Sequence, residues 1–202
     1  MTVRSFMRDQ SGSTAAEFGL VFPLLLLLLF GIIDGGRWIW TYNQAEKATQ
    51  MGARMAIVTN MIEPGIATSY VGVGGLTQGD VIPASAFGLV RCTSTGCTCV
   101  TTPCPTLGTE NTTAFNTVVT RMKYFLPSLT AANVTVEYSS SGLGYAGSPV
   151  LPDLSPMVTV KIGTPATPLQ FRPLTILAIK SVNMPPFTTT LSAEDLSGAV
   201  SN

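Results

Sequence analysis

Residues 12–29 read Gly12-Ser13-Thr14-Ala15-Ala16-Glu17-Phe18-Gly19-Leu20-Val21-Phe22-Pro23, followed by leucine at every position from Leu24 to Leu29. One acidic residue, Glu17, therefore stands at the start of a long apolar run, where a carboxylate is costly unless it has a partner. A short segment that carries Arg4 and Arg8 precedes this run. The arrangement predicts a cleavable leader that feeds a membrane helix.

The apolar run spans a membrane only if its charged end is included. No residue from Phe18 to Ile33 carries a formal charge. At about 1.5 Å per residue this stretch measures ~24 Å, against a hydrocarbon core of ~30 Å. Extension to residue 40 gives roughly 34 Å and brings in Asp34 and Arg37, which are three apart on one helical face and can pair. Aromatic residues that suit a membrane–water interface follow: Trp38, Trp40 and Tyr42. We expect a single span that ends near residue 40.

The apolar segment is expected to stay on the mature protein. An ordinary secretory signal is cut after small residues in an A-x-A-like site. Here the leucines are followed by Gly31-Ile32-Ile33-Asp34-Gly35-Gly36-Arg37-Trp38, a poor match to such a site. The distribution of basic residues on the two sides of the span is close to even. The cysteines favour a carboxy-terminal domain outside the cytoplasm, which places the short amino-terminal head inside it.

The spacing of Gly12, the pair Glu17-Phe18 and a proline inside a leucine run resembles the class III leader of type IV pilin-like proteins. More narrowly, residues 12–56 resemble the TadE-like pseudopilins of tight-adherence (Tad/Flp) pilus systems. TadG-like proteins share this head but usually have a much longer carboxy-terminal region, so the size of the chain favours the TadE-like group. Three pieces carry the resemblance: Ala16-Glu17-Phe18-Gly19-Leu20-Val21-Phe22-Pro23-Leu24-Leu25, Gly31-Ile32-Ile33-Asp34-Gly35-Gly36-Arg37 and Gly52-Ala53-Arg54.

The resemblance implies that a membrane-embedded aspartyl prepilin peptidase cuts between Gly12 and Ser13, which makes Glu17 the fifth residue of the mature chain. Glu17 of a neighbouring subunit is then expected to neutralise the new amine of Ser13, and this pairing sets the axial register. A buried carboxylate is otherwise protonated or strongly disfavoured. The simpler alternative is that Glu17 caps the helix start, where the helix dipole favours an acid. The implied partners are this peptidase, other pilin or pseudopilin subunits, an inner-membrane pilus assembly platform and membrane lipid.

Three further residues of the span bear on helix packing. Pro23 removes a backbone donor and is expected to kink or locally open the helix, which neighbouring helices in a bundle tolerate. Gly31 and Gly35 form a G-x-x-x-G spacing, which permits close helix contact but also occurs by chance in apolar helices.

Beyond the span the pattern predicts an α+β protein in which a long membrane and stalk helix precedes a small extracytoplasmic head. Small or apolar residues continue at helical spacing to Ile62, where Glu63-Pro64-Gly65 is a stop signal. A helix over residues 13–62 measures roughly 75 Å. The expected divisions are a leader at 1–12, a transmembrane helix at 13–40, a stalk helix at 41–63, an α+β domain at 64–191 and a flexible tail at 192–202.

Within the head, hydrophobic periodicity predicts the regular elements. Residues 64–110 are expected to form loops with one or two short strands. Residues 111–125 form an amphipathic helix, and the alternating stretches 133–138 and 157–162 form strands. We further expect a short helix over 173–182 and an edge strand over 187–191. An α+β arrangement follows from this order.

The cysteines predict a disulfide-bearing loop. Cys92, Cys97, Cys99 and Cys104 have the spacing C-x4-C-x-C-x4-C, whereas structural zinc sites usually show C-x2-C pairs. Outside the cytoplasm such thiols oxidise. A Cys97–Cys99 bond closes a strained ring, which leaves either 92–97 with 99–104, or 92–99 with 97–104.

Composition removes most other functions. Lys plus Arg equals Asp plus Glu at 11 each, so charge gives no reason to expect nucleic acid as a partner. The chain has no histidine, which removes the commonest general base and metal ligand. No enzyme, metal or cofactor is predicted. The expected function is that of a minor pilin or pseudopilin in the bacterial inner membrane, which enters a pilus used in adhesion. The alternative is an uncleaved single-pass membrane protein with an external binding domain.

Overall fold

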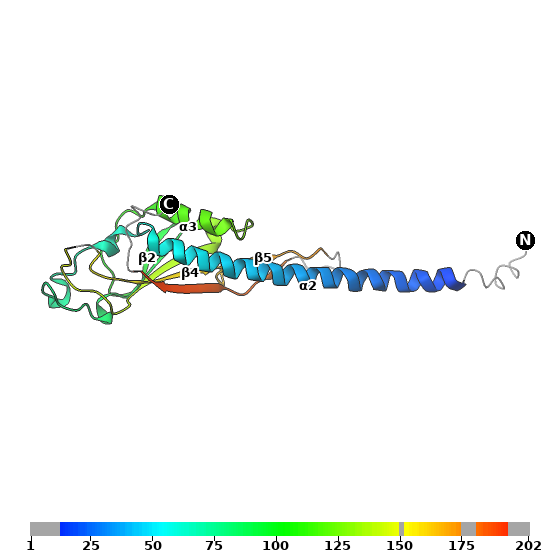
Figure 1. Ribbon diagram of the computed structural model, residues 1–202, viewed down its shortest axis with the longest axis horizontal. Coiled ribbons are helices and arrows are strands. Elements are labelled where there is room, and N and C mark those ends of the chain that lie inside the picture. The colour runs from blue at the N-terminus through cyan, green and yellow to red at the C-terminus, as the bar shows by residue number, and fades with distance from the viewer. Residues whose placement is uncertain (1–12, 150–151, 175–180, 194–202) are drawn as a thin grey trace, which may run out of the picture. The chain divides into compact units, whose positions relative to one another are not determined.

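The computed structural model describes residues 13–149, 152–174 and 181–193 (Figure 1). By internal contacts the chain divides into two compact units. One comprises Met1–Thr41 with Phe171–Val182, and the other comprises Tyr42–Gln170 with Asn183–Asn202. The predicted leader at 1–12 and positions 194–202 of the predicted tail lie outside the described residues.

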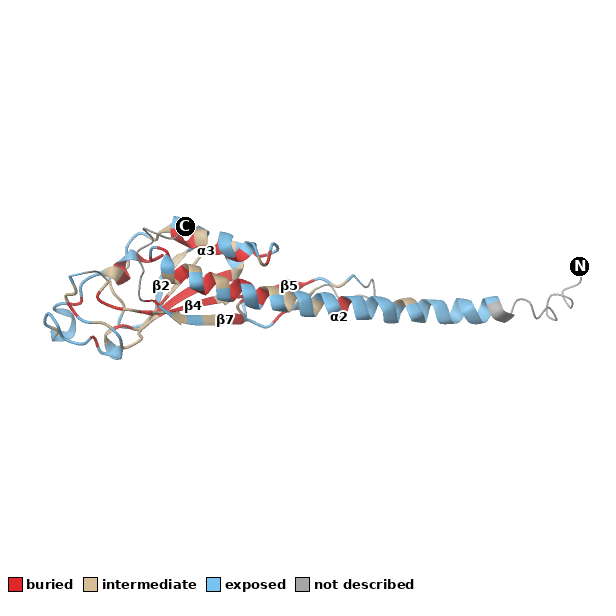
Figure 2. Ribbon diagram, in the orientation of Figure 1, coloured by how far each residue is buried: buried red, intermediate tan, exposed pale blue. Residues whose placement is uncertain are grey.

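Helix α2, Ser13–Val58, is 46 residues long and continues through Pro23 without a break. Its side chains from Phe18 to Ile33 are mostly exposed, as the pale blue part of α2 in Figure 2 shows. Among the described residues α2 is the one helix long and apolar enough to cross a membrane. The predicted long amino-terminal helix is thus confirmed, and it accommodates Pro23 and its glycines without ending.

The end of α2 differs from the prediction of Ile62. The last helical residue is Val58, although the N–H of Thr59 still reaches the carbonyl of Met55 at 3.1 Å. Ile62 instead donates its N–H to the Tyr138 hydroxyl at 3.2 Å, and its carbonyl accepts from the N–H of Asn111 at 2.7 Å. The chain therefore leaves the helix early because the head supplies other partners for this backbone.

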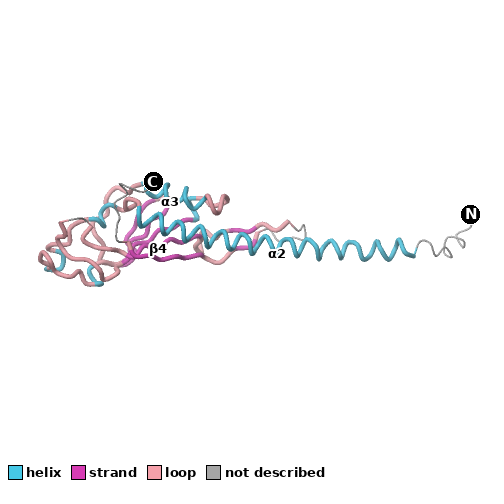
Figure 3. The backbone as a smooth tube through the Cα atoms, viewed as in Figure 1, coloured by secondary structure: helices cyan, strands magenta, loops and turns pink. Residues whose placement is uncertain are grey.

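The head contains a five-stranded antiparallel sheet in the order β2-β1-β3-β4-β7 (Figure 3). Its strands are β1 Leu89–Thr93, β2 Gly96–Thr101, β3 Val134–Ser139, β4 Met157–Ile162 and β7 Phe187–Ser192. A separate two-stranded sheet pairs β5 Gln170–Phe171 with β6 Val182–Asn183. Short 3-10 helices occupy Pro64–Ala67, Val73–Gly75, Ala84–Ala86 and Ala131–Asn133.

The sheet places its apolar residues on one face through its register. Val136 of β3 lies opposite Cys92 of β1 and Val160 of β4, and all three are fully buried. Helix α3, Thr112–Lys123, buries Phe115, Val118, Val119 and Met122, and Asn111 caps it by accepting the N–H of Ala114 at 3.0 Å. This burial follows the predicted helical face, because apolar residues recur at three- and four-residue intervals.

The final turns of α2 pack within the same core. A Cβ placed on Gly52 would lie 2.6 Å from the sulfur of Met122, so glycine at this position gives the Met122 side chain of α3 the room that it occupies against α2. The ring of Tyr42 meets that of Phe187 on β7 edge to face, with centroids 4.9 Å apart. Ala45, Ala48 and Ala53 are fully buried. Small residues therefore fix this half of α2 to the head.

The predicted strands are confirmed, including β7 at the sheet edge. The loop region 64–110 contains two strands, as expected. The predicted helix over 173–182 lies mostly outside the described residues, and its last residue, Val182, belongs to strand β6. Strand β3 departs from simple alternation, because Thr135 and Glu137 on its second face are buried as well.

Candidate functional site

The predicted cleavage and register residues lie at the start of α2. Gly12 lies outside the described residues, and α2 is described from Ser13 onward. Glu17 is exposed on this part of the helix.

The predicted packing glycines leave open space on α2. A Cβ placed on Gly31 or Gly35 would meet nothing within 4 Å, and the same holds for Gly19 and Gly36. Large apolar side chains around them are exposed, among them Leu24 at 70% and Ile32 at 69%. This surface is suited to lipid or to helices of other chains, since in membranes small residues let helix backbones approach closely.

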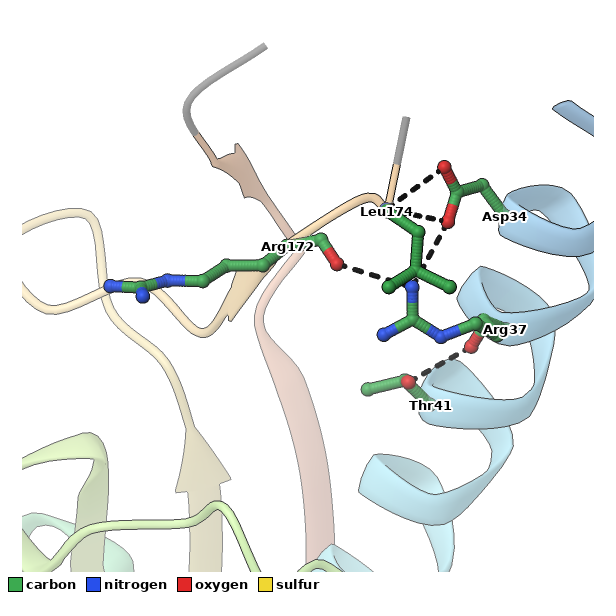
Figure 4. A network of polar contacts seen from close by, with 5 residues as sticks. All are labelled: Asp34, Arg37, Thr41, Arg172 and Leu174. Atoms are coloured by element: carbon green, nitrogen blue, oxygen red, sulfur yellow. Dashed lines mark hydrogen bonds and ion pairs between the residues drawn. The ribbon is translucent and has the colours of Figure 1, made fainter. Parts of the chain in front are cut away.

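Asp34 is the centre of a polar cluster at the end of the apolar run (Figure 4). It pairs with Arg37 at 3.0 Å, as its spacing on the helix predicts. The backbone N–H of Leu174 also donates to both carboxylate oxygens of Asp34, at 2.9 and 3.0 Å. Asp34 is only 8% exposed as a result. The carboxylate is thus satisfied by partners from two parts of the chain that are far apart in sequence.

Aromatic contacts reinforce this cluster. The guanidinium of Arg37 lies 5.3 Å from the ring centroid of Phe171, and its Nη1 lies 3.4 Å from the carbonyl of Arg172. Trp38 meets the same phenylalanine ring edge to face at 5.3 Å. Sequence reasoning identified the Asp34–Arg37 pair but missed residues 171–174, because a contact across some 140 positions leaves no periodic signal.

The four cysteines form two disulfides in the head. Cys92 is bonded to Cys97, and Cys99 to Cys104, which is one of the two pairings that the sequence leaves open. Cys92 and Cys97 lie directly opposite each other in the register of β1 and β2. The bridges therefore hold β2 to the sheet and hold the following loop to β2.

A polar groove lies along the second face of the sheet. Glu137 of β3 accepts from the Nε of Arg91 at 2.8 Å and from the Nζ of Lys161 at 2.7 Å. Burial alone raises the pKa of Glu137, but hydrogen bonds from Lys161 and Arg91 outweigh it and hold the pKa below its usual value. These residues line a groove of about 720 Å³ together with Thr135 and the loop 163–167. Sequence reasoning did not single out this groove. Charged residues are scarce in the chain, at 11%, so Arg91, Glu137 and Lys161 were the one available signal.

A second buried acid organises the loops of the head. Asp153 accepts the backbone N–H groups of Tyr70, Gly147 and Ser148 at 2.7–2.9 Å, and the hydroxyl of Ser69 at 3.2 Å. Burial opposes its ionisation, but these four donors hold the pKa of Asp153 below its usual value. Among the described residues no group of three or more His, Cys, Asp or Glu is placed to hold a metal ion. The role of Asp153 is to fix the loops.

Comparison with protein families identifies the first part of the chain. Residues 12–54 match the family model described as "TadE-like protein". The amino-terminal segment is TadE-like. The match begins at Gly12 and ends inside α2, so it covers the apolar helix and stops before the sheet. No curated protein and no solved structure matches the chain.

Proposed function

We propose that this chain is a minor pilin or pseudopilin subunit that takes part in assembly of a Tad/Flp-type pilus after a prepilin peptidase cuts it between Gly12 and Ser13. One observation carries the proposal. The TadE-like match covers residues 12–54, and within this range the apolar side chains from Phe18 to Ile33 are mostly exposed on a continuous helix. A surface of this kind needs lipid before assembly or other helices after it.

The proposed mechanism of assembly uses Glu17 and the new amino terminus. Cleavage creates a positive amine on Ser13, and Glu17 of the adjacent subunit neutralises it within the apolar environment. Any axial displacement separates two charges that are costly to leave unpaired there. The open space at Gly19, Gly31, Gly35 and Gly36 supports close approach of neighbouring helices.

The proposed location is the bacterial inner membrane, with α2 as a single span and the head outside the cytoplasm. Two disulfides in the head support that side, since such bonds persist in oxidising compartments. The proposed partners are the peptidase, other pilin or pseudopilin subunits, the inner-membrane assembly platform and membrane lipid. The proposed activity in the cell is surface attachment through the pilus.

Cleavage is tested by the intact mass of the protein extracted from membranes of cells that contain the peptidase. We expect a mature chain that begins at Ser13. The variant Gly12→Val should retain the full-length mass, because it replaces the glycine of the proposed cleavage site with a bulkier, β-branched residue. Gly19→Val, at a helix position with open space, should be processed normally. A full-length wild-type chain would favour the alternative.

That alternative is an uncleaved single-pass membrane protein with an external binding domain. The groove over Arg91, Glu137 and Lys161 is the observation that favours it, because it offers charged groups and hydroxyls on the head. Under this alternative, substitution of Arg91 or Lys161 lowers binding of a ligand by the head, whereas Gly12→Val and Glu17→Ala have no effect.

A further inference from the structure

The segment 171–174 lies along α2 at the level where the apolar run ends. Its direction is opposite to that of α2, since Leu174 bonds to Asp34 while the carbonyl of Arg172 accepts from Arg37, one helical turn further along. At about 1.5 Å per residue, Asp34 lies ~26 Å from Glu17 along the helix axis. That distance approaches the ~30 Å thickness of a hydrocarbon core. The segment is therefore fixed at the outer edge of the span.

The exposed side chains at this level follow the polarity of a bilayer surface. Leu174, at the level of Asp34, is 60% exposed. Arg172, at the level of Arg37, is exposed, and its side chain extends away from α2 in Figure 4. On the helix itself Ile39 and Trp40 are 61% and 67% exposed. The apolar side chain thus lies nearer the apolar run and the basic one further from it. The exposed Trp40 follows about one turn beyond Arg37 on α2, a composition typical of membrane interfaces.

We infer that Phe171–Leu174, held to α2 by Asp34 and Arg37, form a lipid-contacting collar at the outer surface of the bilayer. Leu174 inserts at the boundary of the acyl chains, and Arg172 contacts the phosphate of phospholipid headgroups. The inference rests on the proposed location of α2 in a membrane. It adds a second, carboxy-terminal part of the chain to the membrane-contacting surface and lets that part set how deep the helix sits.

Two physical arguments favour lipid as the occupant of this surface. The collar is continuous with the exposed apolar surface of α2, which requires a covering of the same chemistry. The carboxylate of Asp34 is satisfied within the chain by Arg37 and by Leu174. Among the described residues of this segment, the exposed side chains are the cation Arg172 and the apolar Leu174, which complement an anionic headgroup above an acyl layer.

Depth-dependent fluorescence quenching tests the collar in the full-length protein. Leu174→Cys is labelled with an environment-sensitive dye without reductant, so that the four native cysteines stay in their disulfides. The protein is placed in phosphatidylglycerol-containing bilayers with a quencher at the headgroup or deep in the acyl chains. We expect strong quenching by the headgroup quencher at residue 174.

Leu143→Cys is the matched control, because Leu143 is also an exposed leucine, at 57%, but lies in the head. The dye at residue 143 should not be quenched by the headgroup quencher or by the acyl-chain quencher. Leu24→Cys, at the start of the leucine run, tests the membrane span separately from the collar. A quenched dye at residue 24 together with an unquenched one at 174 would overturn the collar alone. An unquenched dye at residue 24 would overturn the membrane span and with it the proposed location.

Two variants then test the named contacts. Asp34→Ala removes the acceptor of the Leu174 N–H, so quenching at residue 174 should fall while quenching at residue 24 is unchanged. Arg172→Gln should lower the equilibrium constant for contact between the collar and an anionic bilayer, obtained from quenching at residue 174, about five-fold. This is the effect expected for one basic residue near such a surface, and it should be smaller at high salt. If the dye at 174 is shielded only when subunits associate, a second copy covers this surface and the collar is wrong.

Discussion

Glu137 is the one acid on the strands of the five-stranded sheet, and it lies between two cations on a strand buried on both faces. Arg91 approaches from β1 and Lys161 from β4, so one side chain couples three strands. Its partners are 43% and 30% exposed, which screens the interaction and keeps it below the strength of a fully buried pair. The two ion pairs of Glu137 therefore contribute to the stability of the head and to the pH dependence of that stability.

At the residue scale we predict that Glu137→Gln lowers the free energy of unfolding of the head by about 1–2 kcal/mol near neutral pH. The pKa of Glu137 is lowered in the folded state. Its contribution is therefore fully present above the unfolded pKa of about 4.3 and is lost as pH falls through the folded value. Wild type and variant should differ by a constant amount above pH ~5, and the difference should shrink as pH falls through the lowered pKa of folded Glu137.

Pulse proteolysis in urea at a series of pH values, on the detergent-solubilised protein, measures this difference. Asp153, whose pKa is also lowered, steepens the acid loss in both proteins alike. Glu46→Gln is the matched control, because Glu46 is an exposed glutamate on α2, and its effect should stay within about 0.5 kcal/mol. A difference for Glu137→Gln that does not shrink on acidification, down to the pH at which the wild type itself unfolds, would contradict the pKa argument.

At the element scale, the hairpin of β1 and β2 depends on two covalent bridges. Each bridge closes a loop of sequence separation 5. By the chain-entropy relation such a loop contributes about 2 kcal/mol. Strand β2 lies at the edge of the sheet and buries little, with its last four residues exposed. The bridges therefore replace the packing that an inner strand has.

We predict that the double variant Cys92→Ala/Cys97→Ala destabilises the head more than Cys99→Ala/Cys104→Ala. Both lose about 2 kcal/mol of loop constraint, but Cys92 is also fully buried among the core valines, so its truncation leaves a void. Hydrogen exchange of the β1 and β2 amides measures the local loss. Equal protection in the two variants would show that packing around Cys92 adds nothing.

The elements that sequence reasoning predicts well are those whose pattern repeats within one segment. Strand β4 alternates buried Val158, Val160 and Ile162 with partly exposed residues, and α3 repeats at helical spacing. The end of α2 was placed four residues late because the competing partners of Ile62 come from Tyr138 and Asn111. Periodicity carries no information about such partners, since they depend on tertiary contacts.

The same reasoning explains what could be predicted of the candidate site. The Asp34–Arg37 pair follows from a three-residue spacing, and the cysteine pairings were reduced to two by ring strain. The bonds from Leu174 to Asp34 and the two cations around Glu137 depend on which strands and segments come together. Nothing in the local sequence of Arg172–Leu174 marks it as the partner of a helix some 140 positions earlier.

At the scale of the whole molecule, the TadE-like match covers one part of the chain and leaves the head outside it. The match covers residues 12–54 and thus the apolar helix, whereas the sheet, the disulfides and the groove lie beyond it. Assembly is therefore expected to depend on α2. The head is expected to contribute whatever is particular to this subunit.

This division predicts the outcome of Glu17→Ala. The variant should insert into the membrane and be cut at Gly12 like the wild type, because removing a carboxylate makes the run more apolar. Its incorporation into sheared pilus fractions should fall at least ten-fold, since the Ser13 amine of each neighbour is left without its counter-charge in an apolar environment. Quantitative immunoblots of membrane and pilus fractions measure both steps.

Glu46→Ala provides the matched comparison, because it removes an exposed glutamate from the same helix beyond the span and should assemble normally. Glu17→Asp distinguishes the effect of the negative charge from the effect of side-chain length. It keeps the negative charge but shortens the side chain by one methylene, so its assembly should lie between that of wild type and Glu17→Ala. If Glu17→Ala assembles as well as Glu46→Ala, the amine of Ser13 has another partner, and the axial register of the subunits must come from the packing of apolar and glycine residues along α2.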